Sequence, residues 1–231
     1  MTLVLPQRQR ARQLFGFLAI FLVVWSVRAT IGYSVDETIA SPIGRAVYAN
    51  FLKFGLWVVP AVVFAALVRK EAPARYLGIS VAPSRAQWGI CLAGLAGFLA
   101  AVAAFETTVG NKSLAWRGLA AMPMAPGLLQ FFVSPLLEEI LFRGLVMKEL
   151  LALRPRLPAG MLTSLLFVGA HLPFWLTHGG PSAAMWSNAL GVFLFSLVAC
   201  WMFARTSSIW PPTVAHIANN LLAAMLVMSQ G

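Results

Sequence analysis

The sequence predicts an all-α protein, a polytopic bundle of about seven transmembrane helices, or eight, around a polar cavity inside the membrane. Three observations lead to this class. Of the 231 residues, 60% are hydrophobic and only 10% are charged, whereas about 25% of a soluble protein is charged. The apolar residues also form long runs, and about 20 of them are enough for one helix to cross the ~30 Å hydrocarbon core. We therefore expect one integral membrane domain, residues 1–231, with its catalytic core in residues 125–225.

Seven apolar segments are long enough to span the bilayer. They run approximately over residues 13–31, 47–68, 88–109, 125–150, 159–177, 184–204 and 209–229. The first follows a cluster of arginines, as a signal peptide would. It is longer than a signal core, however, and no small-residue cleavage pattern follows it, so we expect it to remain as a span. The last begins near Pro211 and Pro212, which the first turn of a helix tolerates.

The loops between these segments carry very different amounts of positive charge. If the N-terminus is inside, the inner segments hold Arg8, Arg10, Arg12, Arg69, Lys70, Arg75, Arg85, Lys148, Arg154, Arg156 and Arg205, and the outer segments hold Arg45, Lys112 and Arg117. Cytoplasmic loops are enriched in Lys and Arg, so we expect a cytoplasmic N-terminus. The net charge of +10 then reflects loops that face anionic lipid, and nothing in the sequence points to nucleic acid.

The fourth segment contains three charged residues in an apolar run, Glu138, Glu139 and Arg143. A charge in hydrocarbon costs at least ~2.5–3.5 kcal/mol, so such residues persist when they are paired or functional. Glu139 and Arg143 are four residues apart, on one helical face, in the favourable order for an ion pair. Glu138 lies about 100° around the helix and must find its partner elsewhere. Two other cations inside spans, Arg28 and Lys53, are expected to extend toward the membrane surface.

Two further segments carry polar residues near their middle. The fifth has His171, with Phe167 one turn earlier, and the seventh has His216 and Asn220 four residues apart. A lone intramembrane His or Asn often does no more than hydrogen-bond a neighbouring helix. Three clusters on three helices instead predict one shared polar site.

These side chains suit the hydrolysis of an amide. A carboxylate taken out of water accepts a proton more readily, so Glu138 could act as the general base, with His171 holding the water. His216 and Asn220 could donate hydrogen bonds to the oxyanion that forms when water attacks a carbonyl group. The Glu139–Arg143 pair would keep the helix oriented.

A metal site would use some of the same atoms. Glu138, His171 and His216 form a two-histidine, one-carboxylate set that could bind zinc or another divalent metal. The sequence contains no His-Glu-x-x-His motif. We favour catalysis by glutamate without a metal cofactor, and the metal remains the alternative.

Taken in order, the three clusters resemble a known family. Glu138-Glu139-x-x-x-Arg143, Phe167-x-x-x-His171 and His216-x-x-x-Asn220 are similar to the motifs of the CPBP family, which comprises CAAX prenyl proteases and bacteriocin-processing enzymes and is also called the ABI family. The resemblance implies an intramembrane endopeptidase. It assigns the first Glu and the first His to the catalytic water, and the His and Asn of the last motif to the oxyanion. The short chain is more similar to bacterial members, which implies a bacterial inner membrane.

Two other function classes are compatible with the same polar residues. One is a non-enzymatic immunity-type factor that only binds a peptide. The other is a proton-coupled transporter, for which we find neither inverted repeats nor paired broken helices. The partners we expect are a peptide or membrane-protein tail and the lipid bilayer.

Overall fold

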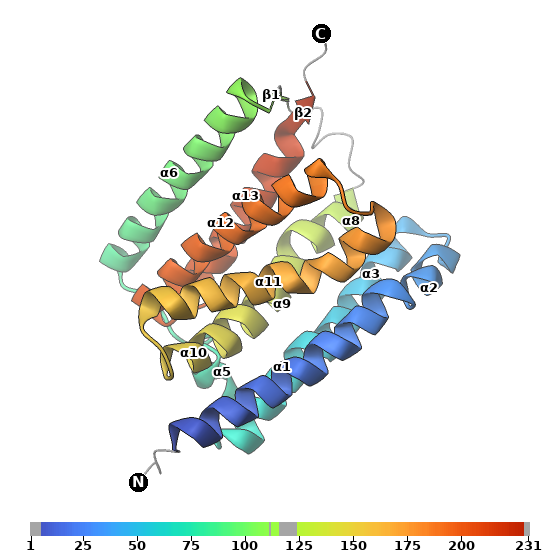
Figure 1. The fold of residues 1–231 in the computed structure, drawn as a ribbon. Helices are drawn as coiled ribbons and strands as arrows, with labels where there is room; N and C mark the ends of the chain where they lie inside the picture. Colours follow the sequence, from blue (N-terminus) through green and yellow to red (C-terminus); the bar gives the residue numbers. More distant parts are fainter. Residues whose placement is uncertain (1–5, 111, 116–123, 229–231) are drawn as a thin grey trace.

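The computed structural model describes residues 6–110, 112–115 and 124–228, and nearly all of them are helical (Figure 1). The elements are α1 (Gln7–Thr30), α2 (Tyr33–Thr38), α3 (Pro42–Lys53), η1 (Phe54–Val58), α4 (Val59–Val63), η2 (Phe64–Val68), α5 (Pro73–Tyr76), α6 (Arg85–Thr108), β1 (Lys112–Leu114), α8 (Met124–Leu128), η3 (Leu129–Val133), α9 (Ser134–Glu139), η4 (Ile140–Met147), α10 (Lys148–Leu151), α11 (Arg156–His178), α12 (Ala183–Thr206), α13 (Trp210–Met225) and β2 (Leu226–Met228). The elements named η are π-helical. The all-α class is therefore confirmed.

Within the described part of the chain, five helices are long and apolar enough to cross a membrane. They are Gln7–Thr30, Pro42–Val68, Arg85–Thr108, Arg156–His178 and Ala183–Thr206. The other two expected spans are also helical. One is the continuous rod from α8 to α10, which carries the charged cluster, and the other is α13, which has only 16 residues. The expected number of seven is thus approximate.

The end of the last expected span is wrong. The helix α13 ends at Met225, because Leu226 leaves the helical region (φ −81°, ψ 105°). Leu226 then pairs with Leu114 in an antiparallel two-stranded sheet of β1 and β2, which the sequence did not predict. Residue 229, where the span was expected to end, lies outside the described residues, as does Arg117.

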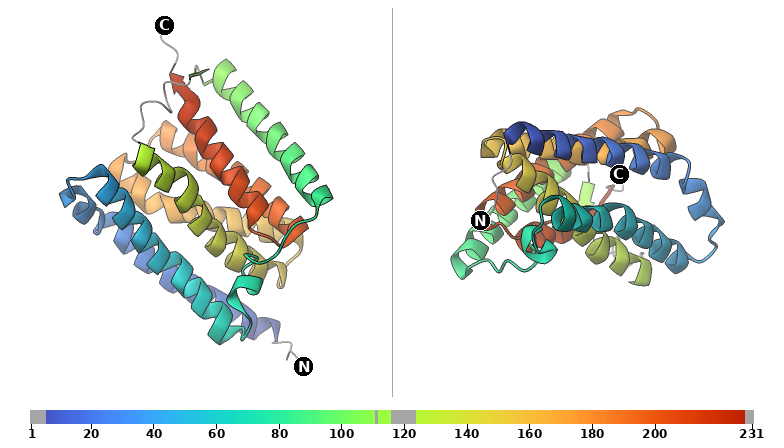
Figure 2. Two further views of the ribbon diagram at one scale, coloured as in Figure 1. Left: turned by 180° about the vertical axis from the view of Figure 1, so that it is seen from behind. Right: turned by 90° about the horizontal axis from the view of Figure 1, so that it is seen from below.

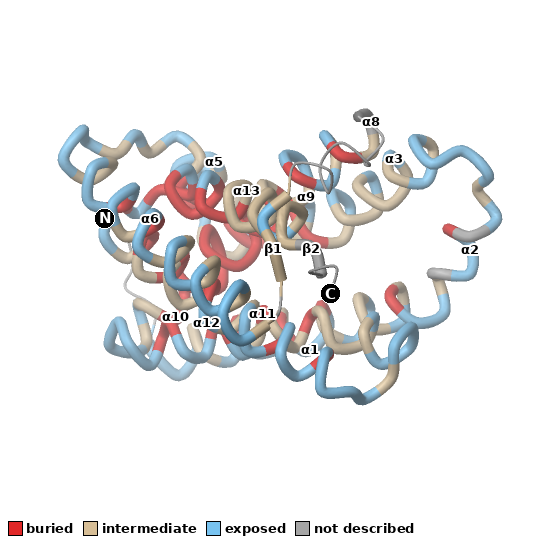
Figure 3. The backbone as a smooth tube through the Cα atoms, turned by 90° about the horizontal axis from the view of Figure 1, so that it is seen from above, coloured by how far each residue is buried: buried red, intermediate tan, exposed pale blue. Residues whose placement is uncertain are grey.

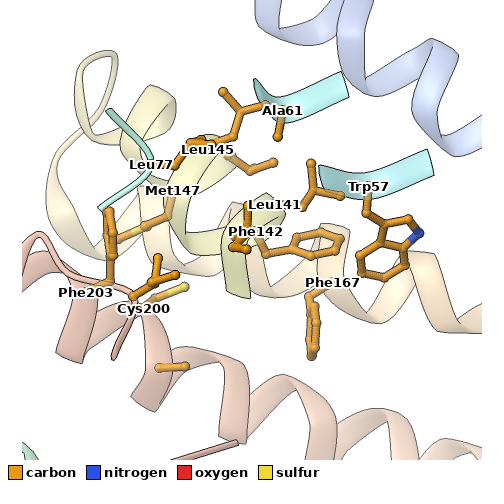
Figure 4. Packing of buried hydrophobic residues seen from close by; sticks show 14 of the residues in the cluster. Trp57, Ala61, Leu77, Leu141, Phe142, Leu145, Met147, Phe167, Cys200 and Phe203 are labelled. Atoms are coloured by element: carbon orange, nitrogen blue, oxygen red, sulfur yellow. The ribbon is translucent and has the colours of Figure 1, made fainter. Parts of the chain in front are cut away.

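The rod from α8 to α10 lies at the centre of the bundle. Viewed from behind, it runs between the rod of α3 to η2 on one side and α13 on the other (Figure 2). Its apolar side chains Leu141, Phe142 and Leu145 are fully buried, and the ring of Phe142 packs edge-on against those of Trp57 and Phe167 (Figure 4). The element that carries the charged cluster is therefore also the core of the fold.

The outer surface of the bundle is apolar, as a lipid-facing surface must be. Figure 3 shows buried segments gathered inside the bundle, while α6 and the outward sides of the other long helices are largely exposed. Large apolar side chains such as Ile20, Leu67 and Phe105 are exposed on them. An apolar surface of this extent is typical of a protein embedded in lipid, and the chain is an integral membrane protein.

A second buried ionic cluster lies at the end of the bundle that carries the N-terminus. The carboxylate of Glu149 is fully buried and accepts hydrogen bonds from Arg10, Arg69 and Tyr76. Burial is the main cause that raises the pKa of Tyr76, and the hydrogen bond to this carboxylate raises it further. The cluster ties α1, Arg69 at the end of η2, and α5 to α10. The first helix is therefore fixed to the core by an ion pair as well as by apolar packing.

Candidate active site

The expected pair of Glu139 and Arg143 is formed at the centre of the bundle. Arg143 Nη1 donates to Glu139 Oε1 at 2.9 Å, and both side chains are fully buried. Arg143 also donates to Ser196 Oγ at 2.9 Å on α12, and its guanidinium lies 4.7 Å from the ring centre of Phe167. The pair therefore joins η4 to α11 and α12. Its local setting is a π-helical stretch, a feature frequent at functional sites.

The imidazole of His216 lies beside both carboxylates of the fourth segment. Its Nδ1 is 2.8 Å from Glu139 Oε1, and its Nε2 is 3.8 Å from Glu138 Oε2. An ionised carboxylate only accepts hydrogen bonds, so the proton of the short contact is on Nδ1. The buried imidazole ring packs against the rings of Phe167 and Phe195. The first and third motifs are thus in direct contact.

Glu138 has a partner that the sequence analysis missed. Lys53 Nζ, on α3, donates to Glu138 Oε1 at 2.7 Å and to Ser134 Oγ at 2.5 Å. It also lies 5.0 Å from the centre of the Trp57 ring. The expectation that Lys53 extends to the membrane surface is therefore wrong, because a buried carboxylate is available inside the bundle. The sequence did contain a signal for this partner. Lys53 is a charged residue within an apolar run, which is the same criterion that singled out Glu138.

His171 lies on α11 with its ring orientation fixed by its own helix. Its Nδ1 is 2.8 Å from the backbone oxygen of Phe167, one turn earlier. A carbonyl oxygen only accepts hydrogen bonds, so Nδ1 donates, and in the neutral ring the lone pair is on Nε2. The ring packs edge-on against Phe167 and near Trp175. His171 therefore presents an acceptor nitrogen.

Glu138 and His171 line one cavity of about 320 Å³. Its walls come from α1, α2, α3, η1, the rod of α8 to α9, and α11. These elements can be followed in Figure 3, where the bundle is seen from the end opposite the N-terminus. The cavity also contains the ion pair of Arg28 with Asp36, at 2.7 Å. Arg28, near the C-terminal end of α1, is thus held by a residue of the short helix that follows α1.

Asn220 is set apart from the other predicted residues. It lies on α13, one turn beyond His216, and is half-buried. Within the described residues its side chain forms no hydrogen bond, and neither Asn220 nor His216 is among the residues that line the cavity. The structure thus joins Glu138, Glu139, Arg143 and His216 directly, places His171 in the same cavity as Glu138, and leaves Asn220 one turn away.

The alternative metal site of Glu138, His171 and His216 is not gathered into a three-ligand set in the part of the chain that the structure describes. Across residues 6–110, 112–115 and 124–228, no three His, Cys, Asp or Glu side chains are placed to hold one metal ion. Glu138 is engaged by Lys53 and His171 by the backbone of its own helix. In this arrangement the residues do not fit a metal centre.

Comparison with known proteins supports the resemblance drawn from the motifs. Residues 120–222 match the family model described as Rce1-like, type II CAAX prenyl endopeptidase Rce1-like. The matched segment contains Glu138, His171, His216 and Asn220, and it is consistent with the CPBP family. No curated protein and no solved structure matches the chain. The family match supports an intramembrane protease.

Proposed function

We propose that this protein is an intramembrane endopeptidase in which Glu138 and His171 activate a water molecule that attacks a peptide carbonyl. The observation that carries the proposal is that these two side chains, from separate helices, line one cavity inside an apolar bundle. Within the described residues, Glu138 Oε2 is buried and has no hydrogen-bond partner. This oxygen, with His216 Nε2 at 3.8 Å, is not taken up by a hydrogen bond and is the one we propose to accept the proton of the attacking water.

His171 is suited to hold that water. Because its Nδ1 donates to the backbone oxygen of Phe167, its Nε2 is an acceptor. A water that donates a hydrogen bond to Nε2 has its oxygen lone pairs directed away from the ring, where they can attack a carbonyl group. Lys53 holds the other oxygen of Glu138 and balances its negative charge inside the membrane. Lys53 is thus a positioning residue for the base.

The oxyanion site is assigned to His216 and Asn220. To donate from Nε2, the ring of His216 must carry a second proton, since Nδ1 already donates to Glu139. The carboxylates of Glu139 and Glu138, on either side of the ring, supply the counter-charge. Asn220 follows on the same helix, roughly 6 Å along its axis, and its amide group would supply a second donor.

The reaction then proceeds with these groups alone. Glu138 takes one proton from water as the water oxygen bonds to the carbonyl carbon, which gives a tetrahedral oxyanion. Collapse of this intermediate breaks the C–N bond. The proton held by Glu138 passes to the leaving nitrogen, so the products are an amine and a carboxylic acid.

The substrate we propose is a peptide or the tail of a membrane protein. The charge distribution of the loops favours a cytoplasmic N-terminus, in a bacterial inner membrane. The helices α2 and α3, which contribute Asp36 and Asn50 to the cavity, lie on the half of the bundle opposite the N-terminal end (Figure 1). Substrate would accordingly enter from the outer side.

The test is a comparison of the membrane and secreted peptides of cells that express the wild-type protein, Glu138→Gln or His171→Ala. We expect specific products with the wild type and none with either variant, at equal levels of inserted protein. Glu138→Gln removes the base but keeps the size and the hydrogen bond with Lys53. Products from Glu138→Gln at the wild-type level would contradict the proposal and favour a binding-only role.

The choice between a metal-free and a metal-dependent mechanism has its own measurement. We propose that no cofactor is involved, since Glu138 is paired with Lys53 and His171 with its own backbone. We expect the purified protein to keep its activity after prolonged dialysis against a chelator. Loss of activity that added zinc restores would contradict the metal-free mechanism.

A further inference from the structure

A groove outside the catalytic cavity lies over α6, α11 and α12. It consists of three adjoining hollows of about 260, 270 and 330 Å³. The first two share Arg156, Ala204 and Arg205, and the last two share Leu197 and Trp201. None of these residues lines the catalytic cavity. The groove is therefore a separate feature of the surface.

One end of the groove is strongly basic. Arg156 and Arg205 are both exposed there, and neither forms an ion pair with any residue that the structure describes. The guanidinium of Arg205 lies 4.8 Å from the ring centre of Trp201, and Gln87 donates to the backbone oxygen of Arg205 at 2.9 Å. The described residues that line the groove include no Asp or Glu.

The helix α11 adds to the positive potential at this end. It begins at Arg156, has no acidic residue in its first turn, and no side chain caps its N-terminus. The N-terminus of a helix carries a partial positive charge and unpaired N–H groups that favour anions. Two unneutralised guanidinium groups and this helix end therefore leave a site that an anion would complement.

The rest of the groove is apolar. From the arginines it continues past Trp201 to Leu197, with Gly160 and Cys200 along its floor. Arg205 and Leu197 are eight residues apart on one helix, which corresponds to about 12 Å along the axis. Gly94 lets α6 come close to α12 at the far end, because a Cβ atom there would lie 2.9 Å from the Trp201 ring. The groove thus has one charged end and a long apolar remainder.

We propose that this groove binds one anionic phospholipid, with its phosphate between Arg156 and Arg205 and an acyl chain along Trp201 and Leu197. Charge complementarity favours this occupant. A neutral lipid or an apolar helix in the groove would cover the two arginines without supplying a negative charge to pair with them. Basic pockets between transmembrane helices are known to hold anionic headgroups. The proposal is independent of peptidase activity.

The experiment measures lipid bound to the purified protein by native mass spectrometry. The probes are phosphatidylglycerol, phosphatidylcholine with the same acyl chains, and inorganic phosphate. We expect one phosphatidylglycerol to bind, with little phosphatidylcholine or phosphate bound at the same concentrations. In Arg156→Gln/Arg205→Gln we expect roughly fivefold weaker binding for each arginine lost, or about 25-fold in all.

The control is Arg12→Gln/Arg154→Gln, which removes the same charge from exposed residues at the same end of the bundle but outside the groove. We expect less than a twofold change in lipid binding for this variant. An equal loss in both double variants would overturn the proposal, because it would show general attraction of a basic surface. Equal binding of phosphatidylcholine, equally tight binding of phosphate, or a protein dimer that the groove variant dissociates would also overturn it.

Discussion

At the scale of single residues, the proposed chemistry depends on how each oxygen of Glu138 is engaged. Lys53 and Ser134 approach Oε1, whereas Oε2 forms no hydrogen bond among the described residues and has His216 Nε2 at 3.8 Å. A base hydrogen-bonded at one oxygen and not at the other has a fixed direction in which to accept a proton. Lys53 therefore has a defined role in the proposed mechanism.

Replacing Lys53 tests this role. We expect Lys53→Met to lower kcat by about 10- to 100-fold with little change in KM, because a hydrogen bond to a charged group is worth about 1.5–3 kcal/mol. Lys53→Arg should recover part of the loss, since it restores the charge. The measurement is the steady-state kinetics of peptide cleavage.

The matched control is Lys70→Met, at an exposed lysine outside the cavity, which should leave kcat unchanged. A change in KM alone for Lys53→Met would show that Lys53 contacts substrate and does not act through Glu138.

The sequence predicted the pair of Glu139 and Arg143 but not the partner of Glu138. The reason is distance along the chain. Glu139 and Arg143 are four residues apart on one helix, where spacing alone predicts contact, whereas Lys53 and Glu138 are separated by 85 residues. Contacts between helices depend on how the helices pack, and a single sequence does not define that packing.

At the scale of elements, the rod from α8 to α10 holds both the buried ion pair and a glycine, Gly144, that lies close to another backbone segment. Arg143 is fully buried and its carboxylate partner is one turn away. Removing one member of such a pair leaves an uncompensated charge, whereas removing both leaves none.

We therefore expect Arg143→Met to lower the free energy of unfolding by about 3–5 kcal/mol. The double variant Glu139→Gln/Arg143→Met should lose less than Arg143→Met alone, because Gln keeps a hydrogen-bonding group beside His216 without the charge. Denaturant titration of the purified protein in detergent measures both values. A double variant less stable than Arg143→Met would contradict the assignment of a charge-balancing pair.

The next residue, Gly144, lets the rod pack against the loop after α5. A Cβ atom at Gly144 would lie 2.6 Å from the backbone oxygen of Leu77, whereas at Gly97 it would meet nothing within 4 Å. We expect Gly144→Ala to destabilise the protein by about 1–3 kcal/mol. Gly97→Ala should be neutral or slightly stabilising, since Ala favours helix. Equal stability of the two variants, measured by the same titration, would count against this packing.

The helices themselves were largely predictable, but their local geometry was not. Long apolar runs predicted all seven helical rods. The π-helical stretches η1 to η4 were not predicted, because the same residues would also suit an α-helix. The pairing of β1 with β2 joins residues 112–114 to 226–228, and such a contact between distant segments has no local signal.

At the scale of the whole molecule, orientation decides which side of the membrane the cavity faces. Arg45 lies in α3, directly before the cavity residue Ala46. Arg12 lies in α1, near the N-terminal end of the bundle. Both are exposed, and the native thiols of Cys91 and Cys200 are buried.

We expect a membrane-impermeant maleimide to label Arg45→Cys in intact cells and to label Arg12→Cys only after the membrane is broken. The reason is the concentration of basic residues in the loops at the Arg12 end. The wild type, with two buried thiols, is the control for background labelling. The reverse pattern would place the N-terminus outside and move substrate entry to the cytoplasmic side.

The most direct measurement is a cleavage assay with purified protein, a library of peptides and membrane-protein tails, and water enriched in ¹⁸O. Mass spectrometry identifies products formed during the incubation by the ¹⁸O in their new C-terminal carboxylates. We predict labelled products with the wild type and none with Glu138→Gln. Labelled products from folded Glu138→Gln at the wild-type rate would contradict the role of Glu138 as the base.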